Sequence, residues 1–181
     1  MTISNQASGI RPGVCTSTTR PVTPYEGQTI YETDTDRLLV WNNSVWIQAS
    51  GPYVAYSATP SGLGNGTANF RYSQSYKTIH FHGTIVHGST TTFVQDITLP
   101  VVASSSYGFL DDIGSCVARD VSTNQYYQMN YIFINTSTLR ILWSGGIGGG
   151  ATNGLFDISS TSPFTWAAGD FISFNLTYEA A

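Results

Sequence analysis

Two histidines with one residue between them, His80 and His82, are the first residues of the chain whose types and spacing suggest chemistry. On a β-strand, residues i and i+2 lie on the same face, so both imidazole rings would point the same way. Imidazole nitrogens bind transition metals, and a threefold assembly would gather one such pair from each copy around its axis. A His-x-His pair without a third ligand is a weak signal, however. The simpler interpretation is two rings on a polar sheet face, and we expect no metal or other cofactor.

A second set of candidates lies on the segment Tyr126–Phe133, which carries large side chains on both faces of a predicted strand. Alternation places Tyr127, Met129, Tyr131 and Phe133 on one side, and Tyr126, Gln128, Asn130 and Ile132 on the other. One side must be core. The other meets a neighbouring subunit or binds a sugar ring, with Gln128 and Asn130 as hydrogen-bonding partners and Tyr126 beside them. Subunit contact is the simpler interpretation.

Catalytic signatures are missing from the sequence. It contains no GxSxG, HExxH, P-loop or dinucleotide-binding pattern, and the glycine-rich run Gly145–Gly150 lacks the lysine of a phosphate-binding loop. We therefore expect a protein that is not an enzyme.

The composition narrows the class further. Charged residues make up 10% of the 181 residues and aromatic residues 13%, with 18 glycines, which is typical of short strands joined by tight turns. A single lysine, Lys77, and a net charge of −4 disfavour nucleic acid as a partner. No long apolar stretch or signal peptide is recognisable, so we expect synthesis in a cytoplasm and no membrane insertion. A surface with so little charge favours self-association.

The N-terminal part of the chain predicts an arm followed by a small meander. Residues 1–24 have no sustained periodicity and read as an extended arm, and residues 25–50 read as three short strands. The predicted strands are Gln28–Glu32, Arg37–Trp41 and Val45–Ile47, separated by turns at Thr33–Asp36 and Asn42–Ser44. So small a unit has little core of its own.

The remainder of the chain, residues 51–181, predicts one larger all-β domain. Its expected strands are Ala68–Tyr72, Lys77–Val86, Phe93–Leu99, Gly114–Arg119, Tyr126–Asn135, Thr138–Ser144 and Phe171–Glu179. Strands at this spacing, with no helical pattern between them, favour an antiparallel β-sandwich of the jelly-roll kind. The predicted fold class is thus all-β, a small β-meander followed by a β-sandwich.

The meander also resembles a known module. The stretch Thr16–Ile47 contains Arg20-Pro21, Glu26-Gly27-Gln28, Ile30–Thr35 as IYETDT, and an Asn-Asn-Ser turn before Trp46. It is similar to segments of bacteriophage tail-fibre, minor-tail and other small virion proteins. Asn43 stands where glycine is frequent in those segments, and asparagine also tolerates positive φ.

The second domain carries a further resemblance to small β-rich proteins encoded among phage structural genes, including head-decoration proteins. The residues that carry it are Tyr53–Tyr56, Gly64–Thr67, Phe70–Tyr72, Gly83–Phe93, Gly114–Asp120, Pro163–Asp170 and Thr177–Ala181. The resemblance implies a homotrimer located in the virion, as a capsid decoration protein or a short tail fibre. It does not separate head from tail.

Together these observations predict a non-enzymatic phage virion protein. We expect its N-terminal region to dock on capsid or tail proteins, with Tyr31, Trp41 and Trp46 forming the module's core and docking residues. The larger domain would trimerise and face outward. The competing hypothesis is a carbohydrate-binding module that recognises a host-cell glycan.

Overall fold

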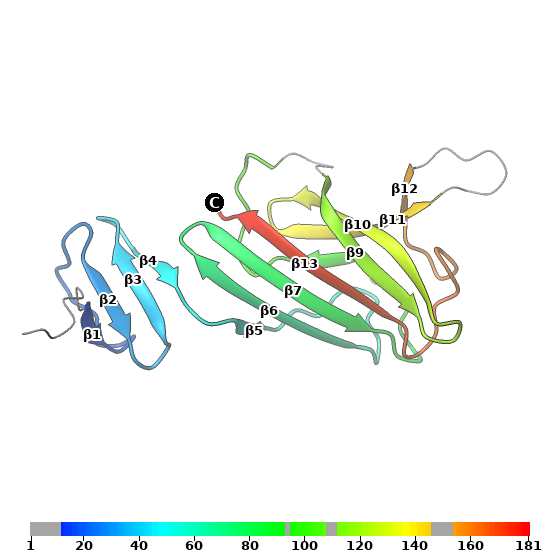
Figure 1. Ribbon diagram of the computed structural model, residues 1–181, viewed down its shortest axis with the longest axis horizontal. Coiled ribbons are helices and arrows are strands. Elements are labelled where there is room, and N and C mark those ends of the chain that lie inside the picture. Colours follow the sequence, from blue (N-terminus) through cyan, green and yellow to red (C-terminus); the bar gives the residue numbers. More distant parts are fainter. Residues whose placement is uncertain (1–11, 93–94, 108–111, 146–153) are drawn as a thin grey trace, which may run out of the picture. The chain divides into compact units, whose positions relative to one another are not determined.

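The computed structural model describes residues 12–92, 95–107, 112–145 and 154–181, and these residues form strands, turns and loops without a helix (Figure 1). No described segment is therefore a helix that could cross a membrane. The chain divides into two compact units. Unit 1 comprises Met1–Pro52 with Gln74–Tyr76, and unit 2 comprises Tyr53–Ser73 with Lys77–Ala181. The prediction of an all-β chain with a small N-terminal sheet and a larger antiparallel one is confirmed.

Unit 1 is a four-stranded sheet in the order β1-β2-β3-β4. The strands are β1 (Gly13–Cys15), β2 (Thr29–Glu32), β3 (Arg37–Trp41) and β4 (Trp46–Ser50). The last three form the expected antiparallel meander, whereas β1 pairs in parallel with β2. Residues 13–15, which the sequence placed in the arm, therefore belong to the sheet. Residues 1–11 of that arm lie outside the described residues.

Two positions in unit 1 have positive φ, and for Asn43 the sequence allowed it. Gly27 has φ of +82°, and its N–H donates to the carbonyl of Trp41 at 2.8 Å. Asn43 has φ of +71° in the turn between β3 and β4, as its type allows. The side chain of Asn42 accepts hydrogen bonds from the amides of Ser44 and Val45, which closes that turn.

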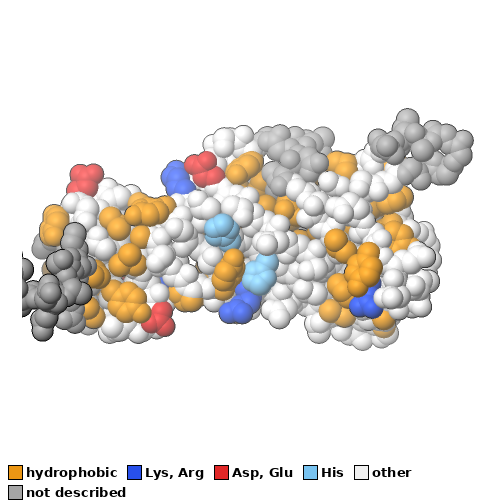
Figure 2. Space-filling model, in the orientation of Figure 1, with side chains coloured by type: hydrophobic (Ala, Val, Ile, Leu, Met, Phe, Trp, Pro, Cys, Tyr) orange, Lys and Arg blue, Asp and Glu red, His pale blue; other side chains and the backbone are white. Residues whose placement is uncertain are grey.

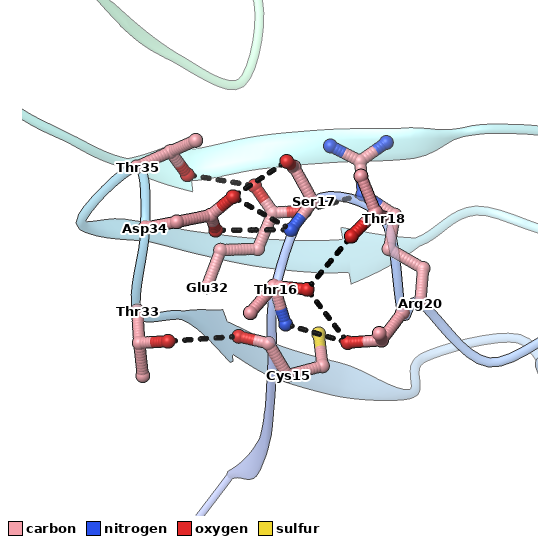
Figure 3. A network of polar contacts seen from close by, with 10 residues as sticks. Cys15, Thr16, Ser17, Thr18, Arg20, Glu32, Thr33, Asp34 and Thr35 are labelled. Atoms are coloured by element: carbon pink, nitrogen blue, oxygen red, sulfur yellow. Dashed lines mark hydrogen bonds and ion pairs between the residues drawn. The ribbon is translucent and has the colours of Figure 1, made fainter.

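A polar network, shown in Figure 3, ties the segment after β1 to the turn between β2 and β3. Glu32 is fully buried, and its carboxylate accepts hydrogen bonds from Arg20 and, at 2.7 Å, from the Thr35 hydroxyl. Asp34 accepts from the amide and hydroxyl of Ser17 at 2.9 and 2.6 Å. Because a buried carboxylate needs such partners, the acidic residues fix the loop in place.

The apolar core of unit 1 is small. Among its described residues only Ile30 and Leu39, a cross-strand pair, are buried hydrophobic side chains. Trp41 lies two residues from Leu39 on β3, so its side chain is on the same face of the sheet as Leu39. Trp46 pairs directly with Trp41 and therefore shares that face. The buried apolar area of this unit is therefore modest, and polar contacts contribute much of its stability.

Unit 2 is built on a nine-stranded antiparallel sheet. Its strands are β5 (Val54–Tyr56), β6 (Thr67–Ser75), β7 (Thr78–Val86), β8 (Asp96–Thr98), β9 (Asp112–Asp120), β10 (Gln125–Asn135), β11 (Thr138–Gly145), β12 (Gly154–Asp157) and β13 (Phe171–Glu179). The order is β12-β11-β10-β9-β13-β7-β6-β5, and β8 also pairs with β11. Strand β13, the last in the chain, therefore lies between β7 and β9, as Figure 1 shows in red.

One face of this sheet forms the core. Alternate residues are buried along β7 and β13, and their partners on β9, β10 and β11 continue the same face. The buried set includes Ile79, Phe81, Ile85, Ile97, Cys116, Met129, Tyr131, Phe133, Leu139, Ile172, Phe174 and Tyr178. Tyr56 of the edge strand β5 donates a hydrogen bond to the carbonyl of Leu99, just after β8. The sheet thus curves until its two ends meet around the core, in the manner of a sandwich.

Gly83 allows two aromatic rings to pack against the middle of β7. A Cβ atom at this position would stand 2.3 Å from the Phe70 ring and 2.8 Å from the Phe174 ring. These two rings lie 5.9 Å apart, and each also contacts Phe81. A side chain at position 83 would therefore displace the centre of the aromatic core.

We expect Phe81→Ala to lower the free energy of unfolding by about 3 to 5 kcal/mol, because the ring is fully buried in this cluster. Thr84→Ala, on the opposite face of the same strand, should change it by only about 0.5 kcal/mol. Urea denaturation followed by circular dichroism measures both. Equal effects of the two substitutions would contradict the assignment of the buried face.

The second prediction concerns Glu32. The hydrogen bond from Arg20, together with that from Thr35, holds the pKa of the Glu32 carboxyl below its ordinary value of 4.5. A folded-state pKa below the unfolded one gives stabilisation that is present above about pH 4.5 and is lost as the pH falls through the folded pKa.

Glu32→Gln should destabilise unit 1 by about 1 to 3 kcal/mol at neutral pH, because a buried charge-assisted pair is lost. The difference from wild type should shrink in acid. The exposed Glu26→Gln provides a matched control and should have little effect. Unfolding measured at pH 7 and at about pH 3 tests this, and a difference that grows in acid would refute it.

Candidate functional site

The outer face of the unit 2 sheet, opposite the core, brings both sequence-predicted candidate sets together. His80 and His82 project from β7 on this face, and Gln128 and Asn130 project from β10. Between these strands lie β13 and β9. In register, His82 is opposite Asn175, Ser173 is opposite Val117, and Val117 is opposite Gln128. Outer-face side chains of β13 and β9 thus lie between the two sets.

A shallow depression of about 390 Å³ lies in this face. Its lining comprises His82, Ser115, Cys116, Val117, Gln128, Ser173, Phe174 and Asn175. The strands β9 and β13 pair only from Phe171–Phe174 with Cys116–Arg119. Beyond that stretch the hydroxyl of Tyr131 donates to the carbonyl of Asn175 at 2.7 Å. The depression lies where the direct pairing of these two strands ends.

The polar groups of the depression suit hydrogen bonding to an uncharged molecule. In the part of the chain that the structure describes, the side chains of His82, Ser173 and Asn175 make no hydrogen bond to protein groups. The Gln128 side chain donates one N–H to the carbonyl of Met129 at 3.3 Å, which leaves its amide oxygen available as an acceptor. Amides and hydroxyls both donate and accept, and no charged side chain lines the hollow.

Aromatic rings flank the depression on both sides. Tyr53, 43% exposed, meets the His82 ring edge to face with centroids 5.0 Å apart. On the other side Tyr126 is 64% exposed, and the Arg119 guanidinium lies over its ring at 5.4 Å from the centroid. Arg119 also lies over the Phe171 ring and donates to the Asn124 side chain at 2.7 Å. Arg119 therefore makes a cation–π contact with the exposed Tyr126 ring.

The histidine pair has polar neighbours in place of metal ligands. His80 Nδ1 lies 3.0 Å from the Thr177 hydroxyl, and His82 contacts Tyr53. Across the described residues, no group of three or more His, Cys, Asp or Glu side chains converges as a metal site would require. In one copy of the chain the pair therefore lies on a polar sheet face, beside Thr177 and Tyr53.

A second, apolar hollow of about 410 Å³ lies farther along the outer face. Its lining comprises Ile132, Ile134, Arg140, Leu142, Leu155, Phe156 and Asp157. Leu155 is 43% exposed, while Arg140 pairs with Asp96 through two hydrogen bonds of 2.7 and 2.9 Å. The outer face of β10 is therefore polar at Gln128 and apolar at Ile132.

The predicted docking residues of unit 1 divide between its two faces. Trp41 and Trp46 are half-buried and pair across β3 and β4 with ring centroids 5.4 Å apart. Tyr31 lies on the opposite face by alternation from the buried Ile30, and its hydroxyl donates to Asp36 at 2.7 Å. The tryptophan pair and Tyr31 therefore do not form one cluster.

Other reactive side chains of unit 2 are used structurally. Asp170 is buried and accepts hydrogen bonds from the amides of Val121 and Ala167. His87 is buried and stacks on Trp166 with centroids 4.4 Å apart, and its burial lowers the pKa of the imidazole. Burial raises the pKa of the Cys116 thiol to about 12, so it stays protonated, and Cys15 and Cys116 are both free.

Sequence reasoning predicted β13, the central strand of the candidate site, but did not assign its residues to the site. Ser173, Asn175 and Thr177 alternate with buried residues on β13, so their position on an outer face was readable. The sequence did not show that they lie between the histidines and Gln128. That position depends on the pairing of β13 with β7 and β9, which are far away in sequence.

Comparisons with protein-family models, with curated proteins and with solved structures find no match to this chain.

The tryptophan pair gives a direct test of unit 1. Trp41→Ala and Trp46→Ala should each lower its stability by about 1 to 3 kcal/mol, less than for a fully buried Trp because both rings are half-exposed. Tyr25→Ala is the matched control, since that ring is 70% exposed. Hydrogen exchange of the β3 and β4 amides reports the change, and unchanged protection in both Trp variants would refute it.

Proposed function

We propose that this chain is a non-enzymatic structural protein of a bacteriophage virion, a homotrimer at the particle surface that docks through its N-terminal unit. It would serve as a capsid decoration protein or a short tail fibre. Its partners would be its own copies, capsid or tail proteins, and a host-surface glycan.

The observation that carries the proposal is that the residues by which unit 1 resembles a phage module contact one another. Arg20 of the Arg-Pro pair bonds Glu32 of the IYETDT stretch, and Asp34 of the same stretch bonds Ser17. Gly27 of the Glu-Gly-Gln triplet bonds the Trp41 backbone. The motif thus corresponds to one self-contained set of interactions, as expected of a module used in different proteins.

Trimerisation is supported by the outer face of unit 2. That face carries the apolar hollow around Ile132 and Leu142, with Leu155 exposed beside it. Ile132 and Leu142 are buried, so the apolar surface open to a partner is that of Leu155 and the half-buried Ile134 and Phe156. Exposed apolar surface is typical of protein contact sites, and a chain with 10% charged residues has little charge to keep copies apart. We therefore propose a second copy of the chain as the partner of this surface.

A structural role also agrees with how the charged groups are used. The chain has seven Lys and Arg residues and eleven Asp and Glu residues. The side chains of Arg20, Arg119 and Arg140 make hydrogen bonds within the protein. Such a surface favours neither nucleic acid nor an anionic substrate. The acidic residues Glu32, Asp120 and Asp170 accept internal hydrogen bonds, which leaves them as structural groups.

Two measurements test the proposal. Light scattering of the full-length protein should give three times the mass of one 19.6 kDa chain. Virions grown from a genome that carries the coding sequence should contain the protein, and Glu32→Gln should lower its incorporation relative to Glu26→Gln, because only the former loosens unit 1. Hundreds of copies per particle would place it on the head, and a few on the tail. A stable monomer that is absent from purified virions would refute the proposal.

A further inference from the structure

We propose that the polar depression on the outer face of unit 2 binds a neutral saccharide, with Gln128 and Asn175 as its main hydrogen-bonding side chains. The inference rests on the proposed function for its setting, a host-cell surface. It adds that the sugar is neutral, and it names the residues that bind it.

The form of the hollow suits a sugar unit. Its volume of about 390 Å³ is at the lower end of the range for small-ligand sites, and it is shallow enough to admit one residue of a longer chain. Four strands, β7, β13, β9 and β10, supply its lining, so the side chains are held on a hydrogen-bonded sheet. Groups fixed in this way lose little conformational freedom when a ligand binds.

The chemistry of the lining indicates a polyol. A sugar ring offers several hydroxyl groups that each donate and accept, and it is matched by side chains that do both. Gln128, Asn175 and Ser173 have this property, and the His82 ring adds two nitrogens that can take part in hydrogen bonds. Among the described residues, the side chains of Ser173 and Asn175 make no hydrogen bonds to protein groups.

The absence of charge from the lining indicates a neutral sugar. The described residues around the hollow include no Lys, Arg, Asp or Glu side chain in its wall. Two arginines of this face lie near the hollow without lining it. Arg119, two residues from Val117 on β9, contacts Tyr126, Phe171 and Asn124, and Arg71 donates to the carbonyl of Tyr53 at 3.3 Å. An acidic sugar would therefore lack a charged partner in the hollow.

The exposed rings complete the arrangement. Tyr126 lies two residues from Gln128, about 7 Å along the strand, and Arg119 lies over its ring. Tyr53 flanks the other side through His82. The apolar faces of pyranose rings pack on such aromatic side chains, so these rings would contact the sugar units that extend beyond the hollow.

The test uses the full-length protein and named sugars, without particles. Isotope-labelled protein is titrated with glucose, galactose, mannose, rhamnose, N-acetylglucosamine and N-acetylgalactosamine at up to about 100 mM, because single-sugar contacts give affinities near the millimolar range. A binding sugar should shift the amide signals of residues 82, 115–117, 128 and 173–175. High salt should leave the affinity unchanged, because the ligand is neutral.

Gln128→Ala and Asn175→Ala should each weaken binding about tenfold. The matched control Asn69→Ala removes an exposed amide from β6, outside the hollow, and should leave binding unchanged. Circular dichroism confirms that each variant is folded. The inference is wrong if none of the six sugars binds, if the shifts map elsewhere, or if the three variants bind alike. Each of those results leaves virion incorporation and trimerisation as separate measurements, so this inference can fail while the proposed function stands.

Discussion

The structure of unit 2 depends on one constraint, that a single antiparallel sheet must bury its own apolar face. The described residues offer no helix to cover Phe81, Phe174 and their neighbours, so the sheet curves around them until β5 and the segment after β8 meet. Because Gly83 has no side chain, the rings of Phe70 and Phe174 can pack directly against the middle of β7. Strand β13 completes the sheet between β7 and β9, which means that the core closes only when the end of the chain is in place.

The same constraint leaves the opposite face to interact with other molecules. Alternate residues along each strand point away from the core, and their side chains make up the outer face of the sheet. In Figure 2 the histidine side chains appear in pale blue on this face, and much of the surface beyond them is white, the colour of uncharged polar side chains and backbone. The face is divided between a polar depression near Gln128 and an apolar hollow near Ile132. A polar surface for sugar and an apolar surface for subunit contact can therefore coexist on one sheet.

Unit 1 is stabilised differently. With Ile30 and Leu39 as its buried hydrophobic side chains among the described residues, it depends on hydrogen bonds from Arg20, Thr35 and Ser17 to the acidic turn. Charge-assisted bonds to a buried carboxylate are strong but directional, so they specify one loop conformation. This explains why a short acidic motif, and not an apolar pattern, marks the unit in the sequence. A unit held in this way is also sensitive to acid, because Glu32 must stay ionised.

The sequence by itself determined the fold class and nearly all the long strands. Alternation of apolar and polar residues is local, so it correctly assigned His80 and His82 to one face of β7 and Ile79, Phe81 and Ile85 to the other. It missed the short strands β1, β5 and β12, where three or four residues carry too little pattern. Only the tertiary structure decided which strands are neighbours. That pairing placed Asn175 between His82 and Gln128 and separated Tyr31 from the tryptophan pair, because contacts between distant segments depend on packing that no local pattern encodes.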